Sequence, residues 1–81
     1  MIRAAVVGVG YLGRFHAQKY AANPRARLLA VIDPSPVARS AVGQELAVAA
    51  LGDYRDMLGK VDAVSIVTPT ATHFEVARDF L

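Results

Sequence analysis

Cysteine is absent from this sequence, so the chain can form no disulfide and no thiolate metal site. The absence fits a reducing compartment, and we expect a cytoplasmic protein without a bound metal. No apolar run reaches the roughly 18 residues that a membrane span requires, and the first residues lack the layout of a signal peptide. The composition therefore excludes a disulfide framework and argues against a membrane partner.

The sequence also has little excess of either positive or negative charge. Nine lysines and arginines stand against seven acidic residues, which gives a net charge of +2. A protein that binds nucleic acid gathers its basic residues on one face, whereas here they are scattered, and we expect no nucleic-acid partner. With 81 residues the chain is at most one small domain, and its 54% hydrophobic content favours burial against something else.

Short apolar runs alternate with segments of helical periodicity along the chain. The runs that predict strands span residues 2–9, 28–32, 47–51 and 61–67. Ser35 before Pro36 is typical of a helix N-cap, and Asp53 is expected to cap a brief helix. Residues 72–75 (Thr-His-Phe-Glu) have the spelling of a capping box, which predicts that a last helix begins there.

This alternation, with short connections, predicts parallel strands joined by right-handed crossovers. We expect an α/β fold with a doubly wound parallel sheet of the Rossmann type, incomplete, with its strands in the order 3-2-1-4. The apolar positions expected to face the sheet are Leu12, Phe15, Ala17, Tyr20 and Ala21 in the first helix and Val37, Ala38, Ala41, Val42 and Leu46 in the second.

The stretch V-V-G-V-G-Y-L-G follows the first predicted strand. In this spacing Gly8 allows the tight turn out of the strand, Gly10 lets the backbone approach a pyrophosphate, and Gly13 brings the helix close to the sheet. The amides of the first helical turn, around Tyr11 and Leu12, would then face the anion. The alternative is a flexible turn with close packing and no ligand.

Asp33 stands at the end of the second predicted strand, 20 residues beyond Gly13. A dinucleotide-binding fold places there the acid that accepts hydrogen bonds from the adenosine ribose hydroxyls. The alternative is that Asp33 only begins a turn with Pro34 and Ser35. The strand, the glycines, the helix and the acid together favour binding of a dinucleotide.

A second signature follows the fourth predicted strand, where His73 comes three residues after the end of T-P-T. Together with GVGYLGRFHAQKY, AVID, a D-Y-R-D-M-L block and VDAVSIVTPTATHFEVA, it resembles the N-terminal nucleotide-binding domain of the glucose-fructose oxidoreductase, inositol dehydrogenase and rhizopine-catabolism (Gfo/Idh/MocA) family. The resemblance covers all 81 residues. It implies that residues 1–81 are the N-terminal part of a dinucleotide-binding domain.

The resemblance also implies NAD as the cofactor and assigns residues to it. The residues that match the family's pyrophosphate loop are Gly8, Gly10, Tyr11, Leu12 and Gly13. Those that match the segment running along the cofactor toward the nicotinamide are Thr68, Pro69, Thr70 and His73. Asp33 matches the ribose acid. The alternative for His73 is a residue of the first helical turn that packs locally.

Other ionisable residues have structural interpretations. His16 matches a frequent family histidine, but midway along the first helix we expect it to be packed and hydrogen-bonded. Asp53 and Asp56 are expected to cap a helix and not to form a catalytic pair. The family has a catalytic lysine in a Glu-Lys-Pro motif after a fifth strand, followed by a substrate domain. This sequence contains neither, so we expect no catalytic residue within it and an inactive chain.

The resemblance implies an oxidoreductase that transfers a hydride from a hydroxyl of a sugar, polyol or nucleotide sugar to NAD. The segment GYLGRFHAQKYA is most similar to members that oxidise the 3-hydroxyl of UDP-N-acetylglucosamine. The alternative is a nucleotide-binding sensing or structural module without redox chemistry.

Self-association is a further expectation. Without a fifth strand the apolar edge at residues 61–67 would be open, with only Asp62 as a blocking charge. We therefore expect the isolated chain to form a homo-oligomer, most simply a two-fold dimer, or else to be the ordered part of a longer polypeptide.

Overall fold

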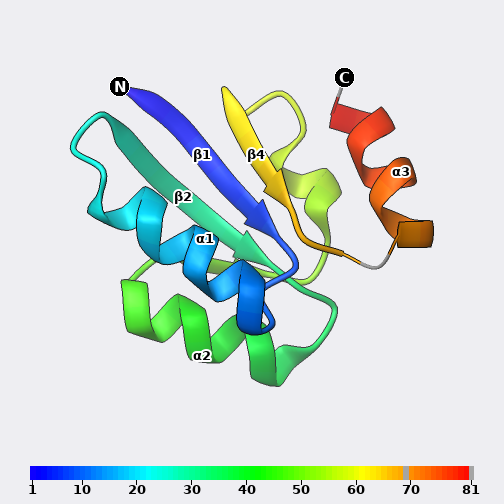
Figure 1. The fold of residues 1–81 in the computed structure, drawn as a ribbon, viewed down its shortest axis with the longest axis horizontal. Coiled ribbons are helices and arrows are strands. Elements are labelled where there is room, and N and C mark those ends of the chain that lie inside the picture. Colours follow the sequence, from blue (N-terminus) through cyan, green and yellow to red (C-terminus); the bar gives the residue numbers. More distant parts are fainter. Residues whose placement is uncertain (69, 81) are drawn as a thin grey trace.

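The computed structural model describes residues 1–68 and 70–80, in which four parallel strands form one sheet with helices on both faces (Figure 1). In chain order the elements are β1 (Ile2–Val7), α1 (Tyr11–Ala22), β2 (Ala26–Ile32), α2 (Pro36–Leu46), β3 (Ala49–Leu51), the 3-10 helix η1 (Tyr54–Met57), β4 (Ala63–Ile66) and α3 (Thr70–Phe80). The order β3-β2-β1-β4 confirms the predicted order 3-2-1-4. No helix in the two described ranges is long and apolar enough to cross a membrane.

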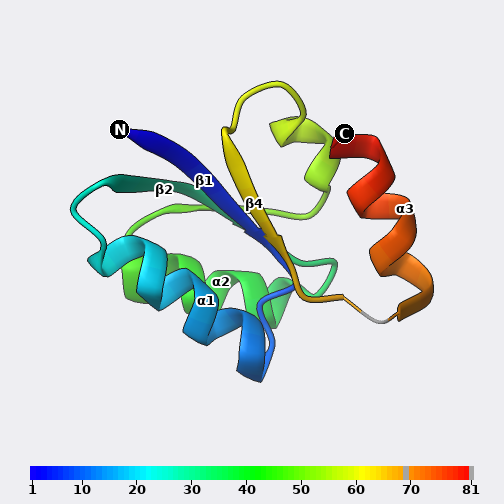
Figure 2. The same cartoon turned by 45° about the horizontal axis from the view of Figure 1, so that its top comes forward.

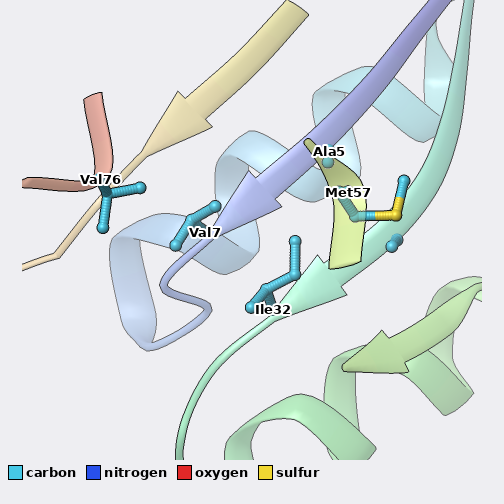
Figure 3. Packing of buried hydrophobic residues seen from close by; sticks show 6 residues of the cluster. Ala5, Val7, Ile32, Met57 and Val76 are labelled. Atoms are coloured by element: carbon cyan, nitrogen blue, oxygen red, sulfur yellow. The ribbon is translucent and has the colours of Figure 1, made fainter. Parts of the chain in front are cut away.

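The sheet builds two cores, because each strand sends alternate side chains to opposite faces. On one face Val6 and Val31 are buried beneath α1 and α2. On the other face Ile32 packs with Met57 of η1 and Val76 of α3 (Figure 3). Figure 2 shows α1 and α2 together on one side of the sheet, with η1 and α3 on the opposite side. The doubly wound arrangement predicted from the sequence is confirmed.

β1 is the central strand and has the least access to solvent. Ala4, Ala5 and Val6 are completely buried, and β1 pairs in parallel with β2 on one side and β4 on the other. A strand buried on both faces has a nearly continuous apolar sequence, which explains the apolar run at residues 2–9. Because all four strands are parallel, their carboxyl ends meet at one edge of the sheet.

The apolar stripes predicted on the first two helices are only partly right. In α1 the buried residues are Gly13 and Ala17, whereas Leu12 and Phe15 are 57% and 46% exposed. The helix rests on its smallest side chains, which lets it lie close to the sheet and turns its bulky residues toward solvent. The positions predicted to be buried but found exposed are Leu12, Phe15, Ala21, Val37 and Ala41.

Two of the predicted helix caps are confirmed. The Ser35 hydroxyl accepts a hydrogen bond from the Ala38 amide at 3.3 Å, and Pro36 is the first residue of α2. Asp53 Oδ1 accepts a hydrogen bond from the Arg55 amide at 2.9 Å at the start of η1. Side-chain oxygens thus replace the acceptors that the first amides of a helix lack.

The capping box predicted at residues 72–75 is wrong. The helix α3 begins at Thr70, so Thr72 lies within it and not at its N-cap. The connection from Ile66, the last residue of β4, is therefore shorter than the sequence pattern suggested. Such short strand-to-helix connections are usual in α/β folds.

Asp62, the charge predicted to guard the β4 edge, is bound by Arg3 at the start of β1. Arg3 donates from Nε and Nη2 to the two carboxylate oxygens at 3.2 and 3.0 Å, and its amide donates to Oδ2 at 2.9 Å. These hydrogen bonds lower the pKa of Asp62 to about 2. The carboxylate is ionised at neutral pH, but its charge is paired with that of Arg3.

Candidate functional site

Two close backbone approaches shape the loop between β1 and α1. Gly8 has a φ of +91°, and a Cβ there would lie 2.3 Å from the carbonyl oxygen of Val67. At Gly13 a Cβ would lie 1.7 Å from the Gly8 carbonyl oxygen. Packing therefore requires both glycines, at the turn out of β1 and where α1 meets that turn, in agreement with the packing roles predicted for them.

Gly10 differs from the other two glycines because it lies open. Apart from its chain neighbours, no heavy atom in the described part of the chain lies within 4 Å of a Cβ built there. Gly10 is the N-cap of α1 and has no side chain to accept hydrogen bonds from the first-turn amides. The amides around Tyr11 and Leu12 therefore have no side-chain acceptor from the N-cap, and the helix dipole favours an anion at this end of α1.

Asp33 follows β2 and reaches back to the glycine loop. Its Oδ2 accepts a hydrogen bond from the Val9 amide at 3.0 Å, and its Oδ1 accepts one from the Ser35 amide at 2.9 Å. These two bonds fix the carboxylate and leave further lone pairs on both oxygens. A purely local turn would not account for the bond to Val9, which is 24 residues away in the sequence.

A cavity of about 390 Å³, here called the strand-end hollow, lies beside Asp33 at the carboxyl ends of the strands. Its wall includes Gly8, Asp33 and Thr68 from the predicted site and the apolar residues Ile32 and Val76. The Thr68 Oγ1 is buried and has no hydrogen-bond partner within the described ranges. A buried hydroxyl without a protein partner is available to a polar group of a ligand, and ligands of open α/β sheets bind in this crevice.

The sequence interpretation missed Tyr54 and Arg55, which also line the strand-end hollow. The Tyr54 hydroxyl donates to Asp79 of α3, and this hydrogen bond raises the pKa of Tyr54. Its ring lies beside Phe80, with centroids 5.9 Å apart. Arg55 pairs with Asp53, Nη2 to Oδ2, at 2.8 Å. A signal was available, because this segment directly follows the third predicted strand, at the edge where ligands of such sheets bind.

Other predicted residues lie away from the strand-end hollow or outside the described residues. His73 is exposed on α3, and His16 is half-buried in α1. Thr70 is the first residue of α3, and Pro69 falls outside the described residues. Within residues 1–68 and 70–80, no group of three histidine, aspartate or glutamate side chains could hold a metal ion.

Comparison with known proteins finds one matching family. A family model described as "Oxidoreductase family, NAD-binding Rossmann fold" (GFO_IDH_MocA) matches residues 2–81. The chain is 51% identical over 77 residues to UDP-N-acetylglucosamine 3-dehydrogenase of Acidithiobacillus ferrooxidans, covering 95% of this chain and 24% of that protein. It is 35% identical over 83 aligned residues to inositol 2-dehydrogenase of Rhizobium meliloti, covering 98% of this chain and 24% of that protein. The chain thus spans about a quarter of the length of these relatives.

Solved structures give the same result. The UDP-N-acetylglucosamine 3-dehydrogenase of Acidithiobacillus ferrooxidans superposes with a TM-score of 0.89 at 49% identity, covering 98% of this chain and 26% of that one. The scyllo-inositol dehydrogenase of Lactobacillus casei, with bound NAD(H) and scyllo-inositol, superposes with a TM-score of 0.87 at 31% identity, covering 99% of this chain and 25% of that one.

Proposed function

Because the chain belongs to the Gfo/Idh/MocA oxidoreductase family, with its NAD-binding Rossmann fold, we propose that residues 1–81 bind the adenosine and pyrophosphate of NAD(H). The protein that carries them is proposed to oxidise a hydroxyl group of a sugar, polyol or nucleotide sugar. When bound, NAD supplies the hydride acceptor, and the residues of this chain supply its position. The residues that bind the substrate and transfer the proton are proposed to lie outside residues 1–81.

Different parts of the cofactor are proposed to bind to different residues of this chain. The amides around Tyr11 and Leu12 are proposed to donate hydrogen bonds to the pyrophosphate, which approaches over Gly10. The fixed Asp33 carboxylate accepts hydrogen bonds from the adenosine ribose hydroxyls, because each oxygen has a lone pair beyond the one that its amide partner uses. The strand-end hollow, with the unpartnered Thr68 hydroxyl in its wall, receives the remaining part of the adenosine.

The position of Asp33 is the observation that carries this proposal, and its replacement tests it. Asp33→Ala is expected to weaken NADH binding by about 1 to 3 kcal/mol, the scale of a lost charge-assisted hydrogen-bonding group. The unchanged protein should prefer NADH to NADPH, because the carboxylate repels a 2′-phosphate. Fluorescence titration with both cofactors measures these two effects.

The matched control is Asp56→Ala, which removes an exposed aspartate of η1 that does not line the strand-end hollow. It should leave the NADH affinity unchanged. Thermal unfolding of each variant separates lost binding from a damaged fold, since Asp33 also accepts hydrogen bonds from Val9 and Ser35. A preference for NADPH in the unchanged protein would overturn the assignment of Asp33.

Turnover is expected only from a longer protein. The isolated 81-residue chain, incubated with NAD and a panel of sugars, should produce no NADH absorbance, because the residues that bind the substrate and transfer the proton are proposed to lie outside it. The 51% identity to a UDP-N-acetylglucosamine 3-dehydrogenase supports nucleotide sugars as the first substrates to test on the complete protein. Turnover by residues 1–81 would place the chemistry in residues to which we assign structural roles.

NADH binding by the complete protein without oxidation of any hydroxyl substrate would favour the alternative, a nucleotide-binding sensing module.

The open edge of β4 is proposed to drive self-association of the isolated chain. Among the described strands β4 is the last of the sheet, and Asp62 is already paired with Arg3. Beside the edge lies a cavity of about 310 Å³ lined by Val64, Ile66 and Phe80 among others. An exposed apolar edge of this kind pairs with another chain, and we expect a two-fold dimer in size-exclusion chromatography with light scattering.

A substitution on the same strand tests which surface is responsible. Ala63→Lys should shift the isolated chain toward the monomer, because a lysine at an edge disfavours pairing and Ala63 belongs to neither hydrophobic cluster of the sheet. A well-folded monomer of the unchanged chain at high concentration would contradict edge pairing.

For the protein in the cell we propose a cytoplasmic location, which its cysteine-free composition supports.

A further inference from the structure

Arg39 lies in α2, away from the glycine loop, yet its guanidinium returns to the segment that carries Asp33. Its Nη1 donates hydrogen bonds to the carbonyl oxygens of Asp33 at 3.2 Å and of Pro34 at 3.3 Å. The side chain is half-buried. One charged group therefore satisfies two consecutive main-chain carbonyls at the turn from β2 into α2.

The same guanidinium lies against the loop that follows β3. A Cβ built on Gly52 would be 3.2 Å from Arg39 Nη1 and 3.5 Å from its Cζ. Gly52 lines the strand-end hollow together with Asp33 and Pro34. Arg39 thus contacts both the loop after β2 and the loop after β3. The same two segments are also joined by the hydrogen bond from the Asp33 amide to the Leu51 carbonyl at 3.1 Å.

These contacts bear on the direction in which the Asp33 carboxylate points. The carboxylate is fixed at its oxygens by two amides, while the main chain that carries it is fixed at its carbonyls by Arg39. If the main chain shifts, the lone pairs left for a ligand turn with it. Arginine suits this task, because its planar group keeps its charge and presents several donors in a rigid geometry.

We propose that Arg39 is a positioning residue for the cofactor: it holds the Asp33-Pro34 backbone, and with it the ribose-binding carboxylate, from the side opposite the glycine loop. The inference rests on the proposed function, since it assigns Arg39 a role in NAD(H) binding that acts through Asp33. Gly52 belongs to the same arrangement, because its lack of a side chain leaves room for the guanidinium.

The test is a double-mutant cycle in the complete protein, measured by NADH titration. Arg39→Met keeps the length of the side chain but removes its donors and should weaken NADH binding about fivefold to twentyfold. Arg39→Lys should lose less, because one ammonium group can still reach a carbonyl. The matched control Arg27→Met, an exposed position near the start of β2, should bind NADH like the unchanged protein.

The decisive variant combines Arg39→Met with Asp33→Ala. If Arg39 acts through Asp33, the double variant should bind NADH as Asp33→Ala does, within about twofold. Losses that multiply would show that Arg39 acts independently of Asp33 and would overturn the inference. If Arg39→Met only damaged the fold, its loss of NADH affinity would also multiply with that of Asp33→Ala. This comparison therefore separates positioning of Asp33 from general damage.

A further variant and two further outcomes keep the failure of this inference distinct from the failure of the proposed function. Gly52→Ala brings a methyl group to 3.2 Å from Arg39 Nη1, so the guanidinium must shift slightly. It should weaken NADH binding less than Arg39→Met does, and should add no further loss to Asp33→Ala, which retains a test if Arg39→Met fails to fold. Unchanged NADH affinity in folded Arg39→Met, with Asp33→Ala impaired, would refute this inference alone. No NADH binding by the unchanged protein, or no effect of Asp33→Ala, would refute the proposed function and this inference with it.

Discussion

Replacing Gly10 by valine is expected to abolish NADH binding while leaving the domain folded. The φ of Gly10 is −69°, which any residue adopts, and an added Cβ would meet no heavy atom of the described residues within 4 Å, its chain neighbours aside. The valine would instead fill the space in front of the α1 amides, where we place the pyrophosphate. Losing these charge-assisted hydrogen bonds should raise the NADH dissociation constant by about a hundredfold or more.

Fluorescence titration with NADH measures this effect, with circular dichroism and thermal unfolding as checks on the fold. Ala21→Val is the matched control, since Ala21 is exposed near the other end of α1. It places the same valine side chain on the surface of the same helix and should leave the NADH affinity unchanged. Normal NADH binding by a folded Gly10→Val protein would mean that the glycine loop serves packing alone.

The second large effect is expected on the stability of the fold, when Gly13 is replaced by alanine. A Cβ at this position would lie 1.7 Å from the Gly8 carbonyl oxygen and 2.7 Å from its carbon, so either α1 or the turn must move. Gly13→Ala is therefore expected to lower the free energy of unfolding by about 3 kcal/mol. That is a large share of the roughly 5 to 15 kcal/mol that keeps a domain folded.

Urea unfolding followed by circular dichroism measures this change. Gly10→Ala is the internal control, because it adds the same methyl group three residues earlier at an open position. It should unfold at the same urea concentration as the unchanged protein. If Gly13→Ala does so as well, the close approach of α1 to the Gly8 turn is not a requirement of the fold.

The fold could be predicted because its strongest signals are local. The completely buried residues of β1 give an apolar run, and short connections leave few topologies open to parallel strands. The buried face of α1 was harder to predict, because Gly13 and Ala17 bring this helix close to the sheet and leave Leu12 and Phe15 exposed. Hydrophobic periodicity shows where apolar residues repeat, but not which of two neighbouring stripes rests on the sheet.

The candidate site divides in a similar way. The glycines and Asp33 could be named from the sequence, because their spacing matches a turn and a strand end. Tyr54 and Arg55 match no spacing motif, and only their place after the third strand indicated that they would line the strand-end hollow. The contact from Arg39 in α2 to the Asp33 carbonyl is marked by no sequence motif. The bond between Asp33 and the Val9 amide is likewise a product of the folded sheet.

A crystal structure of the complete protein with NAD(H) bound is the most direct test of the central claim. The account predicts that both adenosine ribose hydroxyls lie within hydrogen-bonding distance of the Asp33 carboxylate. It also predicts that the pyrophosphate lies over Gly10 against the amides of Tyr11 and Leu12. NAD(H) bound elsewhere, or with its ribose hydroxyls turned away from Asp33, would contradict it.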